Sequence, residues 1–199
     1  MNGMTFEAIA ARIAQVCDEA MVVRSENGQP FVRVPAAALP RVAALLRRDP
    51  ALLCDALMDL TGYDRLKYPG NEASPANDAI AVVYLLFSQQ HHHRVMLEVQ
   101  APRALCSVPT VSGLWPAALY FEREVFDLLG VQFVGHPSLE RILCPDDWVG
   151  HPLRKDYLYP AQYHGVPHLR EGQHFDGAPR RQGDPEPTPT PAPTKKGHP

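Results

Sequence analysis

The first fifty residues alternate between helical and extended patterns of hydrophobic positions. Apolar side chains three or four residues apart predict an amphipathic helix over residues 4–19 and a second one over residues 36–48. Two β-rich runs between them flank Glu26-Asn27-Gly28, and the Asn-Gly pair supplies the positive φ of a tight turn, which predicts a hairpin. Asp49-Pro50 ends the second helix because the residue before a proline avoids helical backbone.

A helix followed by a second hairpin is predicted in the next fifty residues. The helix covers residues 51–60, and residues 61–78 are predicted to be a loop because they contain Gly, Pro and Asn. Residues 80–88 are apolar almost throughout, as in a strand buried on both faces, and residues 94–100 partly alternate. His91, His92 and His93 fall in the turn between these strands and are interpreted as exposed polar loop.

This order of elements predicts an α+β fold of two layers, with helices packed on a mostly antiparallel or mixed sheet and an irregular C-terminal extension. Residues 1–110 are predicted to be the α+β core domain. Residues 111–157, a charged helix with the loops after it, belong to the same globular unit. Residues 158–182 are predicted to be an extended arm that contacts a partner, and the Pro/Thr-rich residues 183–199 a disordered tail.

The charged helix is opened by Trp115-Pro116 and closed by Gly130, because Pro suits the first helical position and Gly the left-handed position after the last. On a helical wheel, Arg123 and Asp127 lie opposite the apolar side, four residues apart, spaced to form an ion pair. Glu122 and Glu124 border the apolar side. They either hold a partner's Arg, a loop backbone or a metal, or are solvated flanks. The wheel alone favours solvated flanks, since charged residues are rarely buried without partners.

The loops after the helix carry the remaining candidates for chemistry. Trp148 lies in a Gly/Pro/Asp-rich stretch, and His136 and His151 each stand between a Gly and a Pro. A metal site could be built from both histidines, Cys144 and an Asp, but the close ligand spacing of metal motifs is missing. An acid/base enzyme using Glu122, Glu124, His136 and His151 is the alternative hypothesis, although the sequence has no nucleophile motif.

Composition narrows the classes of function. A net charge of −3 argues against a nucleic-acid-binding protein. The four cysteines are too scattered for an iron–sulfur cluster or a disulfide framework, and no glycine-rich nucleotide loop is present. The longest apolar run has nine residues, whereas a membrane span takes roughly 20. The start of the chain lacks the pattern of a signal peptide. We therefore expect a chain of the reducing cytoplasm that binds no cofactor or metal itself.

Residues 113–157 carry a longer and more specific pattern. The run E-R-E-x-x-D-x-x-G-[IV]-x-F is followed by G-H-P-x-L-x-R-I-L and then by G-H-P-L-R-K-D-[FY]. This segment closely resembles the signature region of the C-subunit family of respiratory complex I. The chain departs from the family after Tyr157, where Leu158-Tyr159-Pro160 replaces the frequent Pro-Leu. The matching signature residues are expected to be structural or to contact a partner: Trp115, Glu122, Arg123, Glu124, Asp127, Gly130, Phe133, Gly135, His136, Pro137, Arg141, Trp148, Gly150, His151, Pro152, Arg154, Lys155 and Asp156.

The resemblance implies a structural and assembly subunit in the peripheral arm of a proton-translocating NADH-quinone oxidoreductase. It implies that FMN, Fe-S clusters and quinone are bound by partner subunits, and that the isolated chain is not catalytic. It places the chain beside the D subunit, which helps form the quinone site, and near the B subunit. The expected location is the cytoplasmic side of the bacterial inner membrane, with membrane attachment only through partner subunits.

Overall fold

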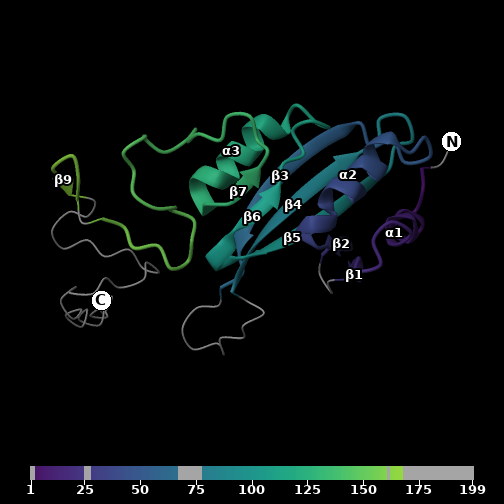
Figure 1. Cartoon of the computed structure of the whole chain (residues 1–199), viewed down its shortest axis with the longest axis horizontal. Helices are drawn as coiled ribbons and strands as arrows, with labels where there is room; N and C mark the ends of the chain where they lie inside the picture. The colour runs from purple at the N-terminus through teal and green to yellow at the C-terminus, as the bar shows by residue number, and fades with distance from the viewer. Residues whose placement is uncertain (1–2, 25–27, 67–77, 161, 168–199) are drawn as a thin grey trace, which may run out of the picture. The chain divides into compact units, whose positions relative to one another are not determined.

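The computed structural model describes residues 3–24, 28–66, 78–160 and 162–167. The chain divides into a first unit, Met1–Tyr157, and a second unit, Leu158–Pro199. In the first unit, α2 and α3 lie over one face of a mixed five-stranded sheet with the strand order β1-β2-β5-β4-β3 (Figure 1). This arrangement confirms the predicted two-layer α+β fold.

The N-terminal helix α1 (Phe6–Ala14) is shorter than the predicted helix. It begins at Thr5, whose hydroxyl accepts a 3.3 Å hydrogen bond from the backbone N–H of Ala8. Ile9 and Ile13, four residues apart, are fully buried. Burial of this one stripe, rather than helix propensity alone, holds so short a helix in place.

The predicted first hairpin is present as β1 (Met21–Val23) and β2 (Phe31–Val34), which pair in antiparallel fashion. Residues 25–27 of its turn lie outside the described residues. Strand β2 also pairs with β5 in parallel, with Val32 opposite Leu97. The sheet is therefore mixed.

The second predicted helix is confirmed. Ala36–Ala38 form a 3-10 turn, η1, that runs into α2 (Leu39–Arg48). Asp49, the residue after α2, accepts a 2.6 Å bond from Arg12 of α1, which joins the ends of the two helices.

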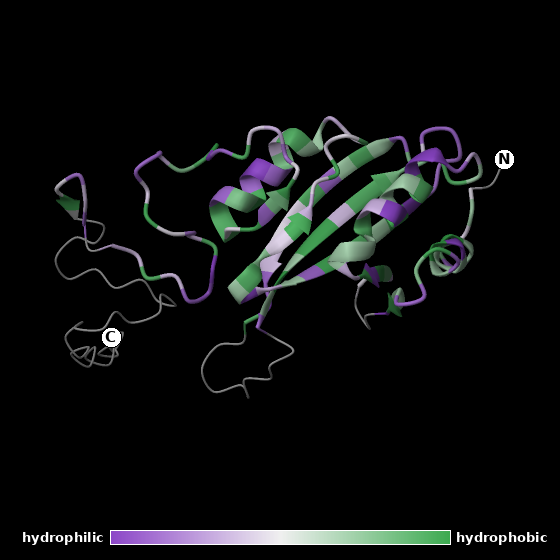
Figure 2. Cartoon of the chain, in the orientation of Figure 1, coloured by the Kyte–Doolittle hydropathy of each residue, from purple (hydrophilic) through white to green (hydrophobic). Residues whose placement is uncertain are grey.

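The central strands β4 (Ala79–Phe87) and β5 (Arg94–Pro102) form the predicted second hairpin, and their hydrophobic run stands out in Figure 2. The exposed-loop interpretation of the turn is wrong for His93, which is only 5% exposed. Its Nδ1 accepts a 3.2 Å bond from the N–H of Met4, and its Nε2 donates a 2.7 Å bond to the carbonyl of Leu52. This histidine satisfies two backbone groups in the core.

The helix predicted over residues 51–60 is wrong, and so is the beginning of the loop predicted over residues 61–78, because residues 61–64 belong to a strand. Ala56–Asp64 form the edge strand β3, which pairs with β4 along its whole length. A bulge between Leu57 and Asp59 places Leu57 and Leu60 on the same buried face. These two apolar residues are therefore three positions apart, which is the spacing expected on one face of a helix. Leu53, with φ of 38°, breaks the helical path before β3 begins. Residues 67–77 of the predicted loop lie outside the described residues.

After the turn η3 (Arg103–Leu105), the chain forms helix α3 (Ala118–Leu129) and a small parallel sheet of two strands, one before the helix in sequence and one after it. Strand β6 (Ser107–Pro109) precedes the helix, and β7 (Gln132–Val134) follows it and pairs with β6. In the second unit, β8 (Gln162–Tyr163) and β9 (Val166–Pro167) pair in antiparallel fashion. The remainder of the predicted arm and the tail 183–199 lie outside the described residues. None of the helices described has the length and apolar character needed to span a membrane.

Candidate functional site

Helix α3 carries some of the signature residues, and others form hydrogen bonds with it. Its inner face packs so closely on β3 that a Cβ added at Gly62 would lie 2.6 Å from Leu129 and 3.0 Å from Val125. Its outer face carries Tyr120, Arg123 and Asp127, three or four residues apart. Figure 2 shows hydrophilic residues on α3 and on the segment after it. A loop of residues 139–151 covers part of this outer face through the bonds described next.

Asp127 is fully buried although it lies on the outer face of α3. Its carboxylate accepts hydrogen bonds from three consecutive backbone N–H groups, those of Ile142 at 3.1 Å and of Leu143 and Cys144 at 2.8 Å. Arg141 completes the shell, with its Nη1 2.6 Å from Oδ1 of Asp127. Burial raises the pKa of Asp127, but these four donors outweigh it and lower the pKa to about 2. The charged carboxylate thus organises the loop around itself.

The predicted ion pair between Arg123 and Asp127 is therefore wrong. The guanidinium of Arg123 donates instead to the backbone carbonyls of Glu140 at 3.0 Å and Arg141 at 2.9 Å. An exposed helical pair is worth only about 0.3–0.5 kcal/mol. The loop offers Asp127 four donors, which the wheel could not reveal.

The C-terminal end of α3 is closed by the second signature segment. A helix leaves its last four carbonyls without helical partners. Here the N–H of Gly130 reaches Phe126 at 2.8 Å, Nδ1 of His151 reaches Asp127 at 2.9 Å, and Nε of Arg154 reaches Leu129 at 2.6 Å. The N–H of Leu153 satisfies the carbonyl of Leu128 at 3.0 Å. Arg154 also places positive charge at the negative end of the helix dipole.

Gly130 makes this closure sterically feasible. Its φ is 74°, in the left-handed region, as the predicted helix end requires. A Cβ at this position would also lie 2.5 Å from the ring of His151 and 2.6 Å from the guanidinium of Arg154. Burial lowers the pKa of His151, and the neighbouring Arg154 and Arg141 lower it further. The bond from Nδ1 to the carbonyl of Asp127 acts in the opposite direction on this pKa, and through it the ring caps the helix end.

The last signature residues bind to the end of β3. Asp64, 6% exposed, accepts a 2.8 Å bond from the backbone N–H of Lys155, and it pairs with Arg103. Nζ of Lys155 donates to the carbonyl of Leu66 at 2.7 Å. Arg103 also reaches Asp156 at 3.0 Å. Burial raises the pKa of Asp64, but its backbone and Arg103 donors outweigh it and lower the pKa below the ordinary value. Asp64 and Arg103 were not among the predicted site residues, because no motif marks them.

Glu122 is fully buried, so its interpretation as a solvated flank is wrong. It accepts a 2.8 Å bond from the N–H of Val111 and a 2.5 Å bond from the hydroxyl of Thr110, and so holds the loop that leads into α3. Burial raises the pKa of Glu122 above its ordinary value, although these two bonds and the nearby His136 offset part of the rise. Glu124 is exposed and makes no hydrogen bond or ion pair to the described residues, as a solvated flank would.

The other signature residues fix turns and fill the core. Nε1 of Trp115 donates to the carbonyl of Cys54 at 3.0 Å, and Trp115 and Phe133 are both 3% exposed. Nδ1 of His136 accepts from the N–H of Ser138, and its Nε2 donates to the carbonyl of Leu119, both at 3.1 Å. His136 lies between Gly135 and Pro137, and His151 lies between Gly150 and Pro152; both glycines have a positive φ. Trp148 is half-buried.

The arrangement binds backbone rather than a reacting group. Glu122, Glu124, His136 and His151, the four residues of the alternative enzyme hypothesis, form no hydrogen bond with one another. Within the described ranges, no three His, Cys, Asp or Glu side chains are grouped so that they could hold a metal ion. The charged groups instead form hydrogen bonds and ion pairs with one another and with the carbonyls at the end of α3. Their combined effect is to fix the loops 110–112, 139–144 and 150–156.

Comparisons with known proteins show which family this chain resembles. Residues 32–163 match the family model described as "Respiratory-chain NADH dehydrogenase, 30 Kd subunit". The chain is 42% identical over 155 residues to the C subunit of the NADH-quinone oxidoreductase of Roseiflexus castenholzii, covering 77% of this chain and 84% of that one. It is 40% identical over 133 residues to a C/D subunit of the Pseudomonas fluorescens enzyme, covering 67% of this chain and 22% of that one. A trypsin-resistant fragment of Nqo5 superimposes with a TM-score of 0.57 at 30% identity, covering 68% of this chain and all of that one.

Proposed function

Because this chain belongs to the family of the 30 kDa subunit of respiratory-chain NADH dehydrogenase, we propose that it is a structural and assembly subunit of a proton-translocating NADH-quinone oxidoreductase. The observation that carries the proposal is the family match over residues 32–163, which spans both the sheet and the signature loops. In this proposal the chain binds no cofactor itself, and electrons pass from NADH through FMN and Fe-S centres to quinone in partner subunits.

The D subunit is the partner we propose first. The Pseudomonas fluorescens relative is named as a C/D subunit, so one polypeptide there bears both designations. Two proteins joined in one chain in a relative are good candidates for neighbours in a complex of separate chains, since a linker keeps them at high effective concentration. The B subunit is the second proposed partner. The chain would then lie on the cytoplasmic side of the bacterial inner membrane, attached only through partner subunits.

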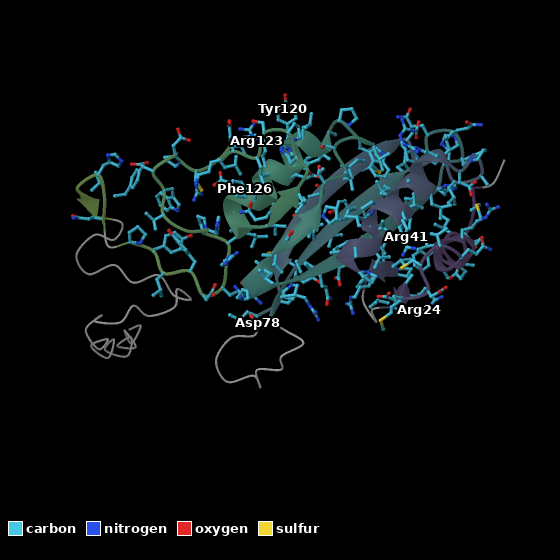
Figure 3. All side chains as sticks on the ribbon, in the orientation of Figure 1. Arg24, Arg41, Asp78, Tyr120, Arg123 and Phe126 are labelled. Atoms are coloured by element: carbon cyan, nitrogen blue, oxygen red, sulfur yellow. The ribbon has the colours of Figure 1, made fainter. Side chains whose placement is uncertain are left out.

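The fixed loops have a surface suited to protein contact. Leu143 is 59% exposed and Val149 is 82% exposed, and both lie in the loops organised by Asp127 and Arg141. Tyr120, on the outer face of α3 beside the exposed Glu124, is 65% exposed (Figure 3). Exposed apolar side chains on a rigid backbone are typical of interfaces, because little conformational entropy is lost on binding. We propose that residues 158–182 also contact a partner subunit.

Purification of the complex tests the proposal. A chain tagged at its N-terminus should be purified from membranes in mild detergent, with its companions identified by mass spectrometry. We expect the D and B subunits in equal amounts with this chain, and NADH-quinone reductase activity in the same fraction. The proposal is wrong if the chain is recovered alone.

The alternative acid/base or metal-dependent enzyme has a separate test. Metal analysis of the dialysed chain would give stoichiometric zinc or iron if that hypothesis were right. We expect less than a tenth of an equivalent, on the order of a contaminant, because both ring nitrogens of His136 and Nδ1 of His151 are hydrogen-bonded to backbone groups.

A further inference from the structure

A groove of about 660 Å³ lies between α2 and the loop that leads into α3. One wall is a stripe of α2 residues four apart, Pro40, Ala44 and Arg48. The opposite wall is the loop 110–114, and Leu119, Gly135 and Pro137 complete the lining. The signature contacts described above leave this groove open.

Arg48 is the one charged residue among the described residues that line the groove, and Arg41 stands outside the lining, seven residues before Arg48 on the same side of α2. Helix α2 has three arginines and no acidic residue between Leu39 and Arg48. Arg47 donates to the carbonyl of Leu114 at 3.3 Å, but Arg41 and Arg48 make no hydrogen bond or ion pair with any residue that the structure describes. Figure 3 labels Arg41 on this helix. None of the residues that line the groove is acidic.

The loop wall is preformed. Both carboxylate oxygens of Glu122 bind it from behind, through Thr110 and the N–H of Val111. The N–H of Ser112 donates to the hydroxyl of Thr110 at 3.1 Å, which closes a further turn. The apex residue Gly113 is exposed, and a Cβ there would meet no atom within 4 Å. A rigid wall reduces the entropy lost when a segment binds against it.

We propose that this groove binds an extended segment of a neighbouring subunit, with apolar side chains in the groove and an Asp or Glu carboxylate against Arg48 and Arg41. Arg is suited to this role because its planar guanidinium binds a carboxylate through two parallel hydrogen bonds. An acidic segment also complements a surface that has cations and no carboxylate. The inference rests on the proposed function, since the segment belongs to another subunit of the same complex.

Photo-crosslinking in the assembled complex identifies the occupant. A photoreactive amino acid replaces Gly113, where the open space tolerates a large side chain. After irradiation of the purified complex, the crosslinked peptide is sequenced by mass spectrometry. We expect one peptide of another subunit with an acidic residue within a few positions of the crosslink. A crosslink to this chain itself, to a segment without acidic residues, or to nothing would overturn the proposal.

Charge reversal provides the second test. The double variant Arg41→Glu, Arg48→Glu should lower the amount of assembled complex roughly tenfold, because two like charges brought together in an interface repel each other. The matched control is Arg94→Glu, an exposed arginine of β5 that lacks a partner in the described part of the chain. Exchange of the crosslinked acidic residue for Lys should restore assembly of the double variant. Equal losses in the variant and the control, or no rescue, would contradict the proposal.

Different results would contradict the proposed function and the groove proposal. If the unaltered chain is purified without other subunits, the proposed function fails. If the unaltered chain assembles and the groove variants assemble equally well, only the groove proposal fails.

Discussion

Arg141 and Asp127 form a salt bridge of 2.6 Å across a sequence separation of 14 residues, on the outer face of α3. The carboxylate is fully buried by the loop that contributes its donors. The pair therefore decides where the signature loop lies.

We expect Asp127→Asn to destabilise the chain by about 3 kcal/mol, since breaking a buried charged pair leaves the other charge uncompensated. Urea unfolding of the purified chain measures the effect. Glu124→Gln, an exposed position on the same helix, is the matched control and should change the unfolding free energy by less than about 0.5 kcal/mol. Equal effects at the two positions would show that Asp127 does not organise the loop.

The same carboxylate makes stability depend on pH. Its pKa is about 2 in the folded chain and 3.8 ordinarily, so it stabilises the fold above the ordinary value, and that stability is lost as the pH falls from about 5 through 2. The difference corresponds to about 2 kcal/mol. Unfolding free energies measured between pH 6 and pH 2 should fall less steeply for Asp127→Asn than for the unaltered chain. Parallel curves would contradict the assignment.

Two glycines allow a steric prediction. Gly130→Ala places a Cβ against His151 and Arg154 at a left-handed φ, and we expect a loss of about 2 kcal/mol or more. Gly113→Ala meets no neighbouring atom and should be close to neutral. Thermal unfolding of both variants, side by side, checks this difference. A neutral Gly130→Ala would mean that the end of α3 has room to rearrange.

Arg154→Ala tests the closure of α3. The variant leaves the carbonyl of Leu129 without its donor, which typically costs about 1–3 kcal/mol for a buried group. We expect less assembled complex on native gels. Arg24→Ala, which removes a fully solvated ion pair with Glu7, should assemble normally. Unchanged assembly and unchanged quinone reductase activity in Arg154→Ala would refute the role of this arginine.

Deletion of residues 183–199 should leave assembly and activity almost unchanged. This Pro/Thr-rich segment has few apolar side chains with which to form a packed contact. Native gels of membranes from the truncated strain provide the measurement. A loss of more than about twofold, the ordinary reproducibility of such comparisons, would assign the tail a function.

The elements that could be predicted from the sequence are those defined by local chemistry. The apolar run of β4 predicted a strand, which is present, but the expectation of burial on both faces is wrong: alternate residues from Ile80 to Leu86 are buried, whereas Val83, Leu85 and Phe87 on the other face are only half-buried. The end of α3 was predicted because Gly130 supplies a backbone conformation that other residues avoid. The signature pattern likewise identified the residues that close α3, although not what they contact.

The elements that could not be predicted depend on distant partners. The edge strand β3 imitates a helix because its bulge places Leu57 and Leu60 three residues apart on one face, and only pairing with β4 decides between the two. Likewise, Asp127 binds a loop that begins 14 residues later, whereas the wheel offered only Arg123. Asp64 binds Lys155 across 91 residues, and no spacing rule covers that distance.

That last contact has a consequence for how the chain is made. Asp64 leaves the ribosome 39 residues before Arg103 and 91 residues before Lys155, so the last of its donors becomes available only late in translation. The parallel pair of β2 and β5 closes earlier, when residue 99 is available. Contacts of such separation form late because the intervening loop must first be closed. We therefore expect the nascent chain to complete its first unit only when residues 150–157 have emerged.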